Sequence, residues 1–198
     1  VIKSLNHEPV DRAPRDLWVH PAIEKLHADW LTEMHLRFLP DIEKPGLSYP
    51  RGQRAKGRPY EVGQYTDAWG CTWITEVNGL EGVVVESPLA DWDALETYRV
   101  PDANKTADRG PVNWEATEKH VAAAKAAGRL TRGGVPHGLL FLRLQYLRGF
   151  ENLMMDMAVG DPRLQRLIDL LVEHNRVLVD HYVRMGVDLM EFADDLGT

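Results

Sequence analysis

The chain has 198 residues, of which 23 are Lys or Arg and 30 are Asp or Glu, so its formal net charge is −7. This negative charge argues against binding to duplex nucleic acid, because that partner requires a basic protein face. Apolar residues make up 44 %, enough for a core, yet no apolar run approaches the roughly 18 residues of a membrane-spanning helix. The single cysteine, Cys71, excludes an internal disulfide and a cysteine-only zinc site. We therefore expect one cytoplasmic globular domain over 1–198. No leader sequence is visible, and we interpret the chain as a piece of a longer protein.

The first sixty residues predict a strand, an amphipathic helix and a loop. Residues 16–19 are a short strand candidate. Pro21 suits the first position of a helix, where a missing N–H is harmless, and apolar residues then recur at helical spacing, so a helix is expected over 21–39. Pro40 ends this helix. The basic stretch over 44–59 is typical of a solvated loop, although its charge could attract an anionic substrate.

The middle of the chain predicts a β-hairpin over 65–86. Residues 69–75 are aromatic and β-branched, which favours a strand, and the dipeptide Asn78-Gly79 is typical of a tight turn. Trp69 and Trp73 would fall on one face of that strand, either as core residues or as a platform for a ligand. A short helical turn is expected next, over 91–95.

The second half of the chain alternates helices with strands. Such alternation is typical of a parallel sheet. A closed (β/α)8 barrel needs about 250 residues, so we expect the N-terminal half to two-thirds of such a TIM barrel, an α/β fold with the β-hairpin as an insertion. The expected strands span 130–135 and 187–193, and the expected helices span 114–127, 139–147, 151–159 and 161–185.

Three positions follow directly after expected strands, where functional residues of parallel β/α barrels lie. They are His20, His137 and the pair Asp194-Asp195. Two adjacent carboxylates repel each other, so one can stay protonated or bind a cation or a substrate donor. Alternatively, Asp195 caps a helix while Asp194 pairs with an arginine. His20 could donate a hydrogen bond to a substrate carboxylate or cap the helix that follows it.

Metal ligation finds little support in the spacing of the histidines. His174 and His181 share a helix face, but seven residues at about 1.5 Å each place them roughly 10 Å apart, too far for one ion. Cys71 has neither His nor Cys close in sequence and is interpreted as a packing residue. No metal site is therefore complete in this chain.

Several blocks of the chain resemble, in order, motifs of the uroporphyrinogen decarboxylase superfamily, whose members are (β/α)8 barrels. The resemblance implies an enzyme with its site at the barrel mouth. With the residues that follow expected strands, we expect Asp194, Asp195 and His20 as catalytic residues and His137 as a substrate-binding residue; Trp69 is a further binding candidate, and the resemblance adds Asp67 and Tyr146. The blocks that carry the resemblance are 8–14, 67–71, 88–95, 147–153, and 186–188 with 194–198.

One branch of this superfamily decarboxylates a tetrapyrrole in porphyrin biosynthesis. Its members hold substrate carboxylates with an arginine-bearing segment, whereas the corresponding residues 17–23 contain no arginine. Asp67 resembles the catalytic aspartate of this branch. Its tyrosine has no direct counterpart, because Leu142 stands near that place and Tyr146 lies one turn further on. Decarboxylation is therefore the alternative rather than the leading expectation.

The other branch contains methyltransferases that act between a corrinoid protein and a thiol or a methyl donor. They bind zinc through a His-x-Cys pair and a distant Cys, which would lie beyond Thr198; zinc keeps a thiolate nucleophilic by lowering its pKa. The hairpin over 69–73 and the ending over 194–197 resemble this branch more closely. We expect corrinoid-linked methyl transfer, with zinc and a corrinoid in the full-length protein and a small molecule or corrinoid protein as substrate. A non-catalytic corrinoid- or partner-binding barrel is a second alternative, and an open sheet edge would allow a homodimer.

Overall fold

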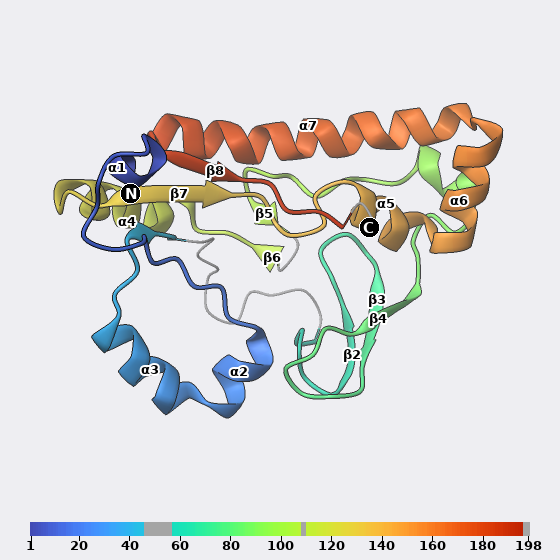
Figure 1. The fold of residues 1–198 in the computed structure, drawn as a ribbon. Helices are drawn as coiled ribbons and strands as arrows, with labels where there is room; N and C mark the ends of the chain where they lie inside the picture. The colour runs from blue at the N-terminus through green and yellow to red at the C-terminus, as the bar shows by residue number, and fades with distance from the viewer. Residues whose placement is uncertain (46–56, 108–109, 196–198) are drawn as a thin grey trace.

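The computed structural model describes residues 1–45, 57–107 and 110–195, and its elements are labelled in Figure 1. The helices are α1 (Ile2–Leu5), α2 (Pro21–Leu26), α3 (Ala28–Arg37), η1 (Trp92–Glu96), α4 (Trp114–Ala126), α5 (Phe141–Arg148), α6 (Phe150–Val159) and α7 (Pro162–Met185). The strands are β1 (Ile42–Glu43), β2 (Gly63–Thr66), β3 (Thr72–Thr75), β4 (Val83–Glu86), β5 (Thr106–Ala107), β6 (Gly110–Pro111), β7 (Leu130–Gly134) and β8 (Leu189–Glu191).

A parallel sheet of order β1-β7-β8 joins the two halves of the chain, as strand–helix alternation predicts. Helices α4 and α7 pack against β7, and α7 runs along β7 and β8 (Figure 1). The approach of α7 is close, because a Cβ at Gly133 would lie 2.5 Å from the ring of Tyr182. One face of this sheet is therefore covered by helices.

The expectation of a (β/α)8 barrel, whole or partial, is wrong. A barrel is a sheet that closes on itself, so that every strand is bonded on both sides. The described residues form a three-stranded parallel sheet with β1 and β8 as open edges, and two separate antiparallel sheets, β2-β3-β4 and the two-stranded β5-β6. Residues 16–19, expected as a strand, are not in a strand, and β1 has only two residues. Alternation indicates how strands pair but not how many strands join one sheet.

The predicted hairpin is present within an antiparallel sheet of order β2-β3-β4. The sequence predicts Trp69 and Trp73 on the same strand. In the structure, however, Trp69 lies in the turn between β2 and β3. Asn78-Gly79 lies in the longer connection over 76–82 rather than in a two-residue turn. Gly79 has φ +88°, and a Cβ there would lie 2.5 Å from Cα of Ala22, so only glycine lets this connection approach α2.

The main core lies between the antiparallel sheet, η1 and helices α5 to α7. It joins the aromatic residues of the hairpin to a leucine stripe on α7 made of Leu164, Leu167 and Leu171. Burying each such leucine is worth about 1.5–3 kcal/mol. Helix α7 has 24 residues but is amphipathic, and no helix within the described ranges is long and apolar enough to cross a membrane.

The single helix expected over 21–39 is divided into α2 and α3. The break is at His27, which has φ −134° and ψ 35°. Leu31 is the buried residue of α3, whereas Trp30 and Leu36 are exposed. Figure 1 shows these two helices away from the bundle of α5 to α7. The apolar side chains that predict this helix are therefore not covered by an equally apolar surface among the described residues.

Candidate functional site

His137 and Asp195 meet at one edge of the parallel sheet. They follow β7 and β8, which are parallel neighbours, so both strands end on the same side. His137 Nε2 lies 3.4 Å from Asp195 Oδ1, and the two side chains are 55 % and 68 % exposed. An imidazole beside a carboxylate is an arrangement suited to general acid–base catalysis. The structure thus brings together two residues that the sequence placed at separate strand ends.

Asp194 ties the end of β8 to the start of α5. Its carboxylate accepts hydrogen bonds from the backbone N–H groups of Leu140 at 2.9 Å, Phe141 at 2.6 Å and Leu142 at 3.2 Å. The residue at the N-terminal cap of α5 makes no side-chain cap bond, so Asp194 takes that role from 54 residues away in sequence. Asp194 therefore positions the backbone from which Asp195 projects, and a direct catalytic role for Asp194 stays a prediction.

His20 caps α2, which is one of its two predicted roles. Its Nδ1 accepts a hydrogen bond from the N–H of Ala22 at 3.2 Å, and its ring lies edge-on to Trp18 at 5.9 Å. Because Nδ1 is the acceptor, the neutral ring carries its proton on Nε2. Among the described residues, no hydrogen bond or ion pair joins His20 to the His137–Asp195 pair. Its catalytic role stays a prediction.

Asp67 is the buried anchor of the β2–β3 turn. One carboxylate oxygen accepts from the N–H groups of Trp69 and Cys71, both at 2.9 Å. The other accepts from Trp73 Nε1 at 3.0 Å and from Arg143 Nη1 at 3.3 Å. Both oxygens are thus used to hold the turn against α5, and Trp69 lies in the core. Substrate binding by these two residues stays a prediction.

Tyr146, also on α5, lies closer to the strand ends. Its half-buried ring packs edge-on against Trp73 with centroids 4.7 Å apart. Burial, followed by the negative charges of Glu81 and Asp195, raises the pKa of Tyr146 to about 12. The phenol is therefore protonated at neutral pH, and Asp195 is near enough for its charge to act on it.

Four charged residues on the parallel sheet form a network that the sequence analysis missed. Lys44 Nζ lies 2.8 Å from Glu191 Oε2, and Arg132 lies 2.7 Å from Asp16 and 3.6 Å from Glu191. The hydrogen bond from Lys44 lowers the pKa of Glu191, against the effect of burial. These contacts link β1, β7, β8 and the segment before α2.

The network occupies the sheet face that turns away from α7. Successive side chains of a strand point to opposite faces, and Gly133 faces α7, so Arg132 and Gly134 face the other way. Gly134 is opposite Glu191 in register and has no side chain, which leaves room for Lys44 to reach Glu191 across β7. An arginine in the middle of the expected strand over 130–135 was the signal in the sequence for this charged face.

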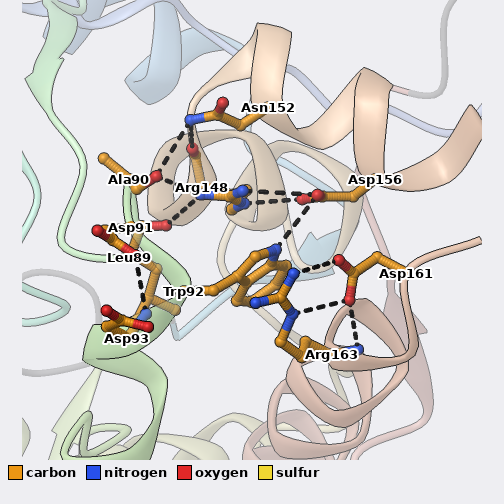
Figure 2. Close-up of polar contacts among 10 residues, drawn as sticks. All are labelled: Leu89, Ala90, Asp91, Trp92, Asp93, Arg148, Asn152, Asp156, Asp161 and Arg163. Carbon is orange, nitrogen blue, oxygen red and sulfur yellow. Dashed lines mark hydrogen bonds and ion pairs between the residues drawn. The ribbon is translucent and has the colours of Figure 1, made fainter. Parts of the chain in front are cut away.

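A denser charged cluster lies where η1 meets α5 and α6 (Figure 2). Arg148 donates to Asp156 at 2.7 Å and to the carbonyl oxygens of Leu89 and Ala90. Trp92 donates to the same aspartate at 3.2 Å, and the guanidinium of Arg148 lies 4.4 Å from its ring centroid. These side chains are buried and bonded to one another, which is typical of a structural network.

The described residues do not fit a zinc–thiolate site. Cys71 is fully buried, burial raises the pKa of its thiol far above its usual range, and its Sγ contacts the carbonyl oxygen of Tyr146. No group of three or more His, Cys, Asp or Glu lies together within 1–45, 57–107 and 110–195. The predicted basic loop falls largely on 46–56, outside the described residues; Arg58 pairs with Glu61 at 3.6 Å.

Comparisons of the chain with protein-family models, with curated proteins and with solved structures gave no match. The resemblance to the uroporphyrinogen decarboxylase superfamily therefore stays a prediction that depends on the sequence blocks.

Proposed function

We propose that this protein is an enzyme that transfers a methyl group between a corrinoid protein and a small-molecule acceptor, with its site at the ends of β7 and β8. The observation that carries the proposal is the exposed His137–Asp195 pair, which is held in place by Asp194 but contributes little to packing. The reaction type comes from the resemblance of the sequence blocks to the methyltransferase branch. The corrinoid enters as part of the partner protein.

Some of the sequence blocks that carry the resemblance lie in contact in the structure. The block over 88–95 bonds to the block over 147–153 through the N–H of Leu89 and the carbonyl oxygen of Leu147, at 2.9 Å, and through Arg148. Asp188, in the block over 186–188, accepts from the N–H and hydroxyl of Thr131 on β7. Two of the blocks thus contact each other, and the block over 186–188 contacts β7.

The chemistry assigned to this chain is proton transfer. His137 would take the proton from the acceptor atom as that atom forms its bond to the methyl group, while the electron pair of the broken bond stays with the donor. Asp195 would orient the imidazole and stabilise its positive charge. Tyr146 would donate a hydrogen bond to the bound substrate. A positioned acid or base of this kind contributes about 10²–10⁴-fold to rate.

The alternative, decarboxylation of a tetrapyrrole, has less support. Its substrate carries several carboxylates and needs free cations. Lys44 and Arg132 lie on the sheet face, but each is already paired with a carboxylate. No arginine is present over 17–23.

The test is methyl transfer from methylcobalamin to a small thiol, followed by the visible absorbance of the corrinoid. We expect His137→Ala and Asp195→Asn to lower kcat/KM by about 10²–10⁴-fold. The matched control is His120→Ala, because His120 also pairs with a carboxylate, Glu43, at 3.0 Å, but His120 is on α4 and Glu43 is level with Thr131, near the start of β7. This control should keep wild-type activity.

Three outcomes would contradict the proposal. The first is the absence of turnover by the folded wild-type protein, and the second is full activity in His137→Ala. The third is cofactor-free conversion of uroporphyrinogen to coproporphyrinogen without methyl transfer, which would establish the decarboxylase alternative instead.

A further inference from the structure

A small, partly open space lies beside the loop that carries His137. It has a volume of about 10 Å³ and lies between the β2–β3 turn, α5, α7 and the loop after β7. Its walls include Trp69, Arg143, His174 and Asn175, and the first three are at least nine-tenths buried. A polar cavity of this size accommodates one water molecule.

Trp69, one of the lining residues, carries a buried donor without an acceptor. Trp69 is 5 % exposed, and its indole Nε1 has no hydrogen-bond partner among the described residues. Its neighbours are engaged elsewhere, since Arg143 donates to Asp67 and Asn175 Nδ2 donates to the carbonyl oxygen of Leu139 at 2.7 Å. A buried N–H without an acceptor is unfavourable, and buried N–H groups of this kind are commonly satisfied by ordered water.

We propose that this cavity binds one ordered water molecule, which accepts a hydrogen bond from Trp69 Nε1 and donates to acceptors on Asn175 and on the loop over 136–139. The water connects the β2–β3 turn to α7 and to the segment that places His137. It thereby stabilises the position of that loop. This inference depends on the cavity and its donor, and it stands whether or not the enzyme transfers methyl groups.

The test is an NMR measurement on the ¹⁵N-labelled protein. We expect a cross-peak between water and the indole Hε1 of Trp69, with the sign that indicates a long residence time. The matched control is Trp73, whose Nε1 already donates to Asp67 and whose indole proton should show no such peak. Trp69→Phe should remove the Trp69 signal and its water peak and leave the Trp73 signal in place.

A hydroxyl proton that exchanges with solvent can imitate a bound water. Tyr98 is the hydroxyl to exclude, because its Oη donates to the carbonyl oxygen of Trp69 at 2.9 Å. The water peak should therefore persist in Tyr98→Phe. The proposal is overturned if the Trp69 indole proton contacts protein protons alone in the wild type, or if its water peak disappears in Tyr98→Phe while the protein stays folded.

Discussion

Two pairs of a basic side chain and a carboxylate lie in contrasting surroundings. Arg148 and Asp156 have side chains 9 % and 8 % exposed and share a network with Trp92 and two carbonyl oxygens (Figure 2). His137 and Asp195 lie at the strand ends, mostly exposed and in contact at 3.4 Å. The first pair belongs to a buried network, whereas the second is accessible from solvent. Pairing alone therefore does not indicate function, and burial distinguishes the two cases.

The largest expected effect is on the buried pair. Asp156→Ala removes the carboxylate partner of Arg148 and leaves its guanidinium buried. We therefore expect a loss of about 3–5 kcal/mol in the free energy of unfolding. Urea denaturation measures this change. A loss below about 1 kcal/mol would show that the Arg148–Asp156 pair is not a structural centre, because breaking a buried pair is costly.

Asp194 has a structural role at the start of α5, and it is also the neighbour in sequence of Asp195 in the exposed pair. Asp194→Ala removes the acceptor for three N–H groups at the start of α5, and we expect a loss of about 1–2 kcal/mol in unfolding free energy. Asp194→Asn keeps one oxygen acceptor and should lose less. Equal losses in the two variants, measured by thermal or urea unfolding, would argue against the capping role.

Asp161 lies at the edge of the buried cluster around Trp92, and its titration makes the stability of the protein depend on pH. It caps α7 and accepts from the side chain and backbone of Arg163, whose guanidinium lies 5.4 Å from the ring centroid of Trp92. The side-chain hydrogen bond of Arg163, followed by the backbone one, lowers the pKa of Asp161 to about 2.

This lowered pKa sets the direction of the pH effect. The carboxylate stabilises the folded state above the pKa of the unfolded chain, about 4, and that contribution disappears as the pH falls toward 2. Asp161→Asn keeps the cap but does not titrate, so its stability should fall less between pH 4 and pH 2 than that of the wild type. Parallel stability–pH curves for the two proteins would contradict this assignment.

The smallest expected effect on stability is at the exposed pair. His137→Ala and Asp195→Ala should each change the unfolding free energy by less than about 0.5 kcal/mol, because exposed ion pairs contribute little. Urea unfolding of both variants tests this. A loss comparable to that of Asp156→Ala would place the strand-end pair among the structural contacts and remove the basis for its catalytic role.

Local signals in the sequence predicted helices α4 to α7 and strands β7 and β8, although not the short strands β5 and β6. Helix α7 is the clearest case, since Asp161 caps it, Pro162 starts it and Gly186, with φ +67°, ends it. The positions of His137 and Asp195 after strands also followed from the pattern. These features depend on residues within one or two helical turns, so a single sequence contains them.

The tertiary structure alone decided how these elements combine. The sequence could not show that the parallel sheet stays open, that Asp194 caps a helix 54 residues away, or that Lys44 and Arg132 meet carboxylates across the sheet. The sequence pattern also predicted Trp69 on a strand, whereas it lies in the β2–β3 turn. Each of these features depends on contacts between distant parts of the chain, and hydrophobic periodicity carries no information about which distant partner a side chain will meet.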